Sequence, residues 1–362
     1  MERESPEGQT IANGDGRGMG GSPTRRRAGD ARHNAPMRSR LLPPLVAAAL
    51  LLAAQVCLAF DLQGHRGARG LAPENTLPAF ARALDLGVST LELDIAVTAD
   101  GEVVVAHDPY LNPAFTRDAS GQWLEGSRGP LIRSLTLAQL RSYDVGRIRP
   151  DSPYARTFSS QQAVDGTRIP TLAEVFELAR GRKAGHVRFN IETKLYPNRP
   201  DDTVGVEAMV EALLRVIRTS AMGERVSIQS FDWRSLQRVQ QLDPNIPTAY
   251  LTIQTANNDN VRDGAWTAGI RLAEHGSVPR LVKAAGGGTW SPNAGALTKE
   301  LVDEAHALRL AVVPWTVNEP ADMDRLVGWN VDGLITDYPD RLREVLQRRG
   351  IALPPAAPAA PR

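Results

Sequence analysis

The sequence predicts an α/β fold, a (β/α)8 barrel with an insertion at the catalytic face of the barrel. Eight short β-type segments alternate with helix-type segments from residue 60 onward, and this alternation is typical of a parallel sheet. Eight parallel strands close naturally into a barrel. The chain has 362 residues and is 42% hydrophobic, so it has enough apolar side chains for the large core that such a barrel needs.

Two segments precede the predicted barrel. Residues 1–36 are rich in Gly, Arg, Ser and Asn without apolar periodicity. We therefore expect them either to be disordered or to lie upstream of the true start codon. Residues 37–59 have the layout of a signal peptide, with arginines, an apolar run and small residues before a cleavage site. The mature protein would then be periplasmic or secreted. The alternative is a retained membrane anchor, because an apolar run of about 19 residues can just span a bilayer.

The barrel domain is expected over residues 60–348. The first strand, at 60–64, is followed by a helix that starts near Thr76 and stops at Gly87, because apolar residues recur between them at helical spacing. The second strand is expected at 90–97. Later strands are expected at 187–194, 226–230, 248–251, 289–291, 311–317 and 333–336, with helices near 207–217, 234–241, 281–285, 299–308, 321–329 and 341–348.

Two further segments do not follow this alternation. Residues 109–170 contain loops and lead to a capping box formed by Thr171 and Glu174. We expect an insertion beside the mouth of the barrel, where such segments commonly shape access to a site. The Pro/Ala-rich residues 349–362 are expected to form a disordered tail.

Charge and cysteine content exclude several kinds of function. Removal of residues 1–59 takes away eight arginines and five acidic residues, so 34 basic and 36 acidic residues remain. Without a basic surplus, no nucleic-acid partner is expected. The single cysteine, Cys57, leaves with the signal segment. The mature chain would therefore have no disulfide, no thiolate metal ligand and no cysteine nucleophile.

Carboxylates occupy two strands where core residues are expected. Glu92 and Asp94 are two residues apart, so both side chains point to one face of their strand. Glu192 lies between Asn190 and Lys194 at the same spacing on the next barrel strand. Three carboxylates from adjacent strands suit one hard divalent cation, Ca²⁺ or Mg²⁺. Alternatively, these carboxylates form ion pairs with nearby cations, or the strands are edge strands with one wet face.

Two histidines add proton-transfer chemistry. His65 follows the first strand and His107 ends the apolar run 103–106, so both would lie at the face where barrel enzymes place catalytic groups. Imidazole can both accept and donate a proton near neutral pH. A lone histidine is more often structural. Two histidines beside an acidic triad, with Arg66 and Lys194 available for an anion, favour a site that acts on a phosphoryl group.

Five segments together resemble the signature blocks of the glycerophosphodiester phosphodiesterase family. In chain order they are HRGARGLAPENTLPAF, LELDIAVTADGEVVVAHD, IETK, VVPWTVNE and DGLITDYP, between about residues 62 and 345. The resemblance implies a (β/α)8 barrel in which Glu92, Asp94 and Glu192 hold one divalent metal ion. It also implies His65 and His107 as general acid and base, Arg66 and Lys194 as phosphate ligands, and Gln229, Phe231 and Trp315 as pocket residues, with Asp337 at the last strand end. Trp315 could equally fill the barrel.

The implied activity is hydrolysis of a small-molecule glycerophosphodiester to glycerol 3-phosphate and a free alcohol. One alternative is a lysophospholipase D or sphingomyelinase D-like lipid phosphodiesterase on the same barrel, which would need an apolar groove at its mouth. A second alternative is a non-catalytic exported binding protein on a decayed barrel. Contact with a membrane is expected only if the signal segment is retained.

Overall fold

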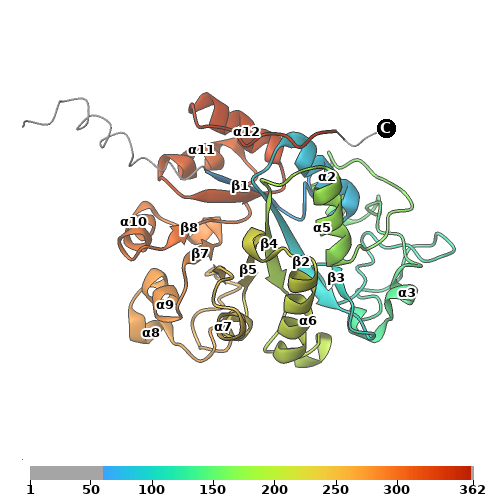
Figure 1. Ribbon diagram of the computed structural model, residues 1–362, viewed down its shortest axis with the longest axis horizontal. Coiled ribbons are helices and arrows are strands. Elements are labelled where there is room, and N and C mark those ends of the chain that lie inside the picture. The colour runs from blue at the N-terminus through green and yellow to red at the C-terminus, as the bar shows by residue number, and fades with distance from the viewer. Residues whose placement is uncertain (1–59, 360–362) are drawn as a thin grey trace, which may run out of the picture. The chain divides into compact units, whose positions relative to one another are not determined.

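Eight parallel strands form the barrel in the computed structural model, which describes residues 60–359 (Figure 1). The predictions for residues 1–36 and 37–59 lie outside the described residues. The strands lie in the order β8-β7-β6-β5-β4-β2-β1-β9. Their bounds are β1 (Asp61–Gly64), β2 (Thr90–Val97), β4 (Arg188–Thr193), β5 (Val226–Ser230), β6 (Thr248–Thr252), β7 (Thr289–Pro292), β8 (Ala311–Val312) and β9 (Gly333–Thr336).

Backbone hydrogen bonds also join the two ends of this strand order. The amides of Asp332 and Ile335 donate to the carbonyls of Val312 and Pro314 at 2.9 and 3.0 Å, and the amide of Val317 donates to Ile335 at 3.0 Å. The segment around β8 thus meets the segment around β9. The predicted (β/α)8 fold class is confirmed.

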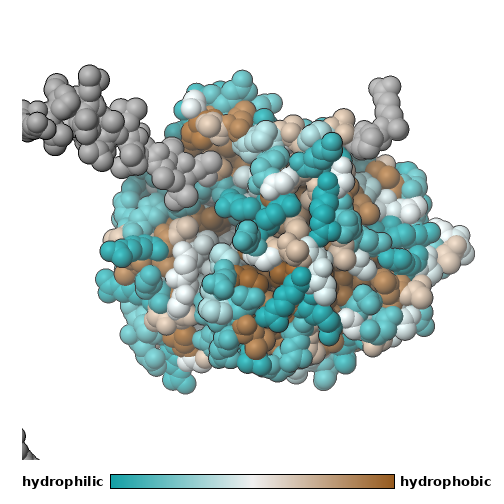
Figure 2. Space-filling view, in the orientation of Figure 1, coloured by the Kyte–Doolittle hydropathy of each residue, from teal (hydrophilic) through white to brown (hydrophobic). Residues whose placement is uncertain are grey.

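Helices surround the barrel because each has one apolar face that packs on the strands (Figure 1). Outward-facing strand residues such as Leu91, Leu93 and Ile191 are fully buried beneath them. Hydrophilic residues cover most of the face shown in Figure 2. The helices are α2 (Leu77–Leu86), α5 (Leu172–Gly181), α6 (Val206–Thr219), α7 (Trp233–Leu242), α8 (Leu272–His275), α9 (Val278–Ala284), α10 (Lys299–Ala307), α11 (Pro320–Gly328) and α12 (Pro339–Arg348).

The strand expected at 311–317 is much shorter than predicted, because β8 ends at Val312. Pro314 has no amide hydrogen, so the regular ladder cannot continue through it. The chain nevertheless stays beside β7, since the amides of Val313 and Trp315 donate to the carbonyls of Trp290 and Pro292, both at 3.0 Å. Trp315 is therefore held at the carboxyl end of the barrel without belonging to a regular strand.

The insertion at 109–170 stands at the carboxyl-terminal end of the strands. β3 (Val103–Val105) pairs antiparallel with the last three residues of β2 and leads into the insertion. The insertion contains a short 3-10 turn (Ile132–Ser134) and the helices α3 (Leu137–Leu140) and α4 (Pro153–Thr157). A small apolar core of its own forms from Ala96, Val104, Leu111, Ile132, Leu140, Val145 and Ile169.

The tail differs from the predicted disorder as far as it is described. Residues 351–359 have no regular secondary structure, yet the amide of Ala357 donates to the carbonyl of Leu84 at 2.9 Å. Arg182 and Arg343 donate to tail carbonyls at Pro358 and Pro354. Composition did not reveal these donors, which hold the tail against α2, α5 and α12.

Among residues 60–359, no helix is both long and apolar enough to cross a bilayer.

Candidate active site

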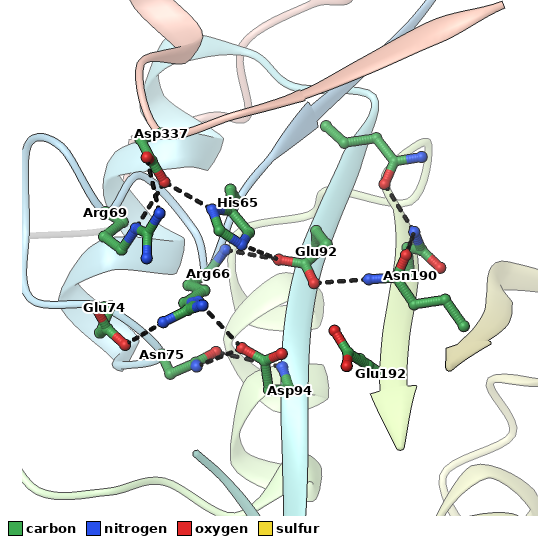
Figure 3. A network of polar contacts seen from close by, with 12 residues as sticks. His65, Arg66, Arg69, Glu74, Asn75, Glu92, Asp94, Asn190, Glu192 and Asp337 are labelled. Atoms are coloured by element: carbon green, nitrogen blue, oxygen red, sulfur yellow. Dashed lines mark hydrogen bonds and ion pairs between the residues drawn. The ribbon is translucent and has the colours of Figure 1, made fainter. Parts of the chain in front are cut away.

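Glu92, Asp94 and Glu192 meet inside the barrel near the carboxyl ends of β2 and β4 (Figure 3). The strand register pairs Asp94 with Glu192 and Glu92 with Asn190, and alternate residues of a strand share one face. One oxygen from each of the three carboxylates lies within 4.8 Å of the others, and all three residues are buried. The structure therefore brings together the acidic triad that the sequence predicts.

Two cations lie against these carboxylates. Lys194 Nζ is 2.7 Å from Glu192 Oε1 and 3.1 Å from Asp94 Oδ1. Arg66 Nε is 3.2 Å from Asp94 Oδ2. The predicted ion pairs are thus present, but Asp94 Oδ1 accepts no well-directed hydrogen bond within the described residues.

The residues fit a divalent cation on grounds of charge. Within the described residues, four buried carboxylates, those of Glu74, Glu92, Asp94 and Glu192, have two directly paired basic side chains, Arg66 and Lys194. Burying carboxylates without compensating charge is costly. One divalent ion would balance the set, and buried carboxylate oxygens are the ligands that Ca²⁺ and Mg²⁺ prefer.

The pKa values of the triad reflect this imbalance. Burial and the neighbouring Asp94 raise the pKa of Glu92. Burial also raises the pKa of Glu192 to about 7, although Lys194 acts in the opposite direction. Burial works to raise the pKa of Asp94 as well, but Lys194 and Arg66 hold it well below its ordinary value. Asp94 is therefore ionised near neutral pH, whereas burial disfavours the charged form of both glutamates, and added positive charge would favour it.

A tight turn after β1 places Arg66. A Cβ at Gly64 would lie 2.2 Å from the carbonyl oxygen of Gly67, and Gly67 itself has φ +87°. Arg66 has φ 50°, a conformation that is uncommon outside glycine and is retained where surrounding contacts impose it. In this conformation its amide donates to Glu92 Oε2 at 2.9 Å. The closely spaced glycines thus let the backbone turn so that Arg66 reaches the triad with both its amide and its side chain.

His65 is buried beside the triad and is held by Asp337. Its Nδ1 lies 2.7 Å from Asp337 Oδ1, and its Nε2 lies 3.9 Å from Glu92 Oε2. Arg69 donates to both oxygens of Asp337, at 2.7 and 2.9 Å. Burial and Arg69 lower the pKa of His65 to about 3, against the opposing effect of Asp337. The imidazole is therefore neutral near pH 7, with its Nδ1 proton donated to Asp337 and its Nε2 facing the site.

His107 lies in a more open position than His65. Its Nδ1 is 2.9 Å from Asp108 Oδ1, and Asp108 Oδ2 accepts from Asn112 in the insertion at 2.7 Å. His107 lines a cavity together with Glu74 and apolar residues of the insertion. Burial and the nearby Arg66 lower the pKa of His107 to about 4. The second predicted histidine thus lies where the insertion meets the barrel.

The three predicted pocket residues occupy different surroundings. Gln229 donates to Glu92 Oε1 at 2.7 Å, so it supports a member of the triad from inside the barrel. The Phe231 ring lies 5.9 Å from Lys194 Nζ and packs edge-on against Trp315 at 5.3 Å between centroids. Phe231 and Trp315 are half-buried, so they form an aromatic wall beside Lys194.

Several residues of the site were not predicted from the sequence. Asn75 donates to Asp94 Oδ2 at 2.9 Å, and Glu74 accepts from Arg66 at 2.7 Å. Asp337 and Arg69 orient His65, whereas the family resemblance placed Asp337 at the last strand end without a role. Glu74 and Asn75 lie in the run from Pro73 to Thr76. This run has the pattern of an ordinary helix start, because Thr76 caps α2, so it did not indicate a functional role for either residue.

Comparison with known proteins establishes the family. Residues 65–341 match the model of the glycerophosphoryl diester phosphodiesterase family. The chain belongs to this family. A glycerophosphodiester phosphodiesterase of Bacillus subtilis (strain 168) is 32% identical over 285 residues, which cover 78% of this chain and 84% of that protein. Another from Caldanaerobacter subterraneus subsp. tengcongensis is 31% identical over 288 residues, which cover 79% and 97%. The predicted enzyme class, glycerophosphodiester phosphodiesterase, is confirmed.

Solved structures of similar proteins share the barrel. A candidate glycerophosphoryl diester phosphodiesterase from Silicibacter pomeroyi DSS-3 is 37% identical, with a TM-score of 0.73 over 82% of this chain and 95% of that one. A phosphodiesterase from Oleispira antarctica, solved in complex with the product sn-glycerol-3-phosphate, has a TM-score of 0.59 over 80% of this chain and 98% of that one. At 21% identity, the second likeness concerns the fold alone.

Proposed function

We propose that this glycerophosphodiester phosphodiesterase uses one divalent metal ion, Ca²⁺ or Mg²⁺, and releases glycerol 3-phosphate and a free alcohol with His65 and His107 as proton-transfer residues. The observation that carries the proposal is the buried triad of Glu92, Asp94 and Glu192, which lies within reach of His65. The names of the relatives and the product bound by the Oleispira antarctica enzyme support the substrate class.

Positive charge at the site would offset the negative charge of the substrate's phosphoryl oxygens. A phosphodiester carries negative oxygens that repel a nucleophile. When bound to the triad, a divalent ion would act as a Lewis acid toward a phosphoryl oxygen. Arg66 and Lys194 would donate charge-assisted hydrogen bonds to the phosphate, which stabilise the charge that grows in the transition state.

The two histidines suit different steps. Because Asp337 holds the Nδ1 proton of His65, the Nε2 atom is free to accept a proton from the nucleophile, which is water or a substrate hydroxyl group whose cyclic phosphate product water then opens. His107, at the junction with the insertion, would protonate the departing alcohol. A bound phosphate anion would act to raise the pKa of both imidazoles, against the burial and the arginines that lower it.

A lipid phosphodiesterase would need a groove for an acyl chain. Among residues 60–359, the exposed large apolar side chains are Val164 and Leu242. They are single residues on different elements, the insertion and α7, and do not make a groove. Apolar residues of the insertion do line the cavity that His107 borders, so the choice of a small water-soluble diester over a lysophospholipid or sphingomyelin rests on the names of the relatives.

The metal proposal is tested with the metal-stripped enzyme and glycerophosphocholine. EDTA should abolish release of glycerol 3-phosphate, and Ca²⁺ or Mg²⁺ should restore it. Either cation should also raise the Tm of the wild type by mass action but not that of Glu192→Gln. Full activity in EDTA would defeat the proposed metal role.

The proton-transfer roles are tested on the same assay. His65→Gln and His107→Gln should each lower kcat by roughly 100-fold or more. His306→Gln is the matched control, because His306 pairs with Asp332 away from the triad. Loss of activity in the control alone, or full activity in either variant, would contradict these roles.

A further inference from the structure

The short helix α4 of the insertion reaches back to the loop after β1. The side chain of Ser152 accepts from the amide of Ala155 at 3.2 Å, and Pro153 occupies the first turn. Both features fix the start of a helix. They fix the place of Tyr154, whose side chain leaves the insertion and meets Glu74 of the barrel.

Tyr154 supplies one of two donors to a buried carboxylate. Its hydroxyl donates to Glu74 Oε2, while Glu74 Oε1 accepts from Arg66 at 2.7 Å. Glu74 is only 8% exposed, so each oxygen depends on its protein partner rather than on water. Of the two donors to Glu74, Tyr154 comes from the insertion and Arg66 from the barrel.

Aromatic packing holds the Tyr154 ring in place. The ring centroid lies 5.6 Å from that of Phe115 and 4.8 Å from that of Phe158, and both rings belong to the insertion. Such contacts restrict the side chain to one orientation. The hydroxyl position is therefore set by the fold of the insertion.

Arg66 pairs with two carboxylates at once, through Nη1 with Glu74 and through Nε with Asp94. Its guanidinium is 2.7 Å from Glu74 and 3.2 Å from Asp94. If Glu74 turned away or took up a proton, Arg66 would pair with Asp94 alone. Asp94 belongs to the acidic triad, so that shift would both misplace the guanidinium and neutralise an oxygen that a cation needs.

We propose that Tyr154 is a positioning residue that fixes Glu74 and, through it, holds Arg66 in the orientation that binds the phosphate of the substrate. The inference rests on the proposed role of Arg66. It assigns the insertion a part in the site, since one of its side chains holds the carboxylate with which Arg66 pairs.

Tyr154→Phe removes only the hydroxyl and keeps the aromatic packing. We expect a rise of about tenfold in KM for glycerophosphocholine and in the inhibition constant of glycerol 3-phosphate, with a smaller fall in kcat, as for loss of one hydrogen bond to a charged group. Tyr143→Phe is the matched control. Tyr143 also packs in the insertion core, and we expect its variant to behave like the wild type with the same Tm as Tyr154→Phe.

A double-mutant cycle separates action through Glu74 from direct contact with the substrate. In a Glu74→Ala background, adding Tyr154→Phe should change KM by less than about twofold. If Glu74→Ala does not fold, Glu74→Met, which fills the space without an acceptor, takes its place. Fully additive losses, or a Tyr154→Phe variant identical to Tyr143→Phe, would overturn the inference.

Arg66→Met distinguishes the failure of this inference from the failure of the proposed function. If Arg66→Met weakens glycerol 3-phosphate binding and Tyr154→Phe does not, the positioning role of Tyr154 is wrong while the proposed function stands. If neither variant weakens binding, the phosphate-binding role of Arg66 is wrong and the inference falls with it.

Discussion

The orientation of His65 depends on a carboxylate that comes from the other end of the chain. Asp337 follows β9, which pairs with β1, so closure of the barrel brings residues 65 and 337 together. Arg69 and Asn318 donate to the Asp337 oxygens, and the histidine and arginine hold the pKa of Asp337 well below its usual range against burial. A fixed anion at Nδ1 selects one tautomer of His65.

Asp337→Asn should therefore lower kcat for glycerophosphocholine by roughly 10–100-fold, the usual range when a group that orients a functional histidine is lost. The side-chain amide nitrogen of the asparagine is itself a donor. It would face one of the donors that now bind Asp337, which are Arg69, Asn318 and the Nδ1–H of His65. Asp332→Asn is the matched control, because Asp332 also contacts a histidine, His306, at 2.9 Å. Equal activity of both variants would show that Asp337 does not orient a catalytic His65.

Residues on strands, or just after a strand end as His65 and His107 are, were predictable, whereas residues farther along the loops were not. Glu92, Asp94 and Glu192 follow a two-residue period, so their shared face could be derived from the sequence. Glu74, Asn75 and Tyr154 lie on a loop and a short helix without such a period. Their contacts depend on how the insertion folds over the barrel, and local sequence does not encode that.

Among the elements, the regular βα units were predictable and the irregular segments were not. Strands such as β2 and β4 alternate apolar and polar residues, and α2 is bounded by Thr76 and Gly87. β8 ends early because Pro314 cannot donate to the ladder. The tail 349–359 was expected to be disordered from its composition, yet arginines on distant helices hold its carbonyls.

Truncation after Gly350 should lower the free energy of unfolding by about 1–3 kcal/mol, because it removes a few hydrogen bonds and the contacts of buried Ala357. The tail contacts the C-terminal ends of α2 and α5, which lead into the amino ends of strands. The site lies at the carboxyl ends, so kcat and KM should not change. Urea unfolding and steady-state kinetics measure the two quantities. An unchanged midpoint would show that the tail does not stabilise the fold.

At the scale of the whole molecule, the barrel concentrates charge at its centre. Residues 60–362 are nearly neutral by composition, but the interior holds an excess of carboxylates at one end. Two histidines with lowered pKa values lie at the same end. Stability should therefore depend on pH through buried groups rather than through net surface charge.

His107 provides the test of that dependence. Its pKa in the fold is about 4 against an ordinary value of 6.5, so between these values the unfolded chain binds a proton that the folded chain does not. Stability from this group is complete above pH 6.5 and falls as pH drops toward 4. His107→Gln should reduce the slope of the free energy of unfolding against pH by up to the contribution of one proton, about 1.4 kcal/mol per pH unit. Urea unfolding with EDTA at several pH values measures the slope, and equal slopes for wild type and variant would show that burial does not hold His107 neutral.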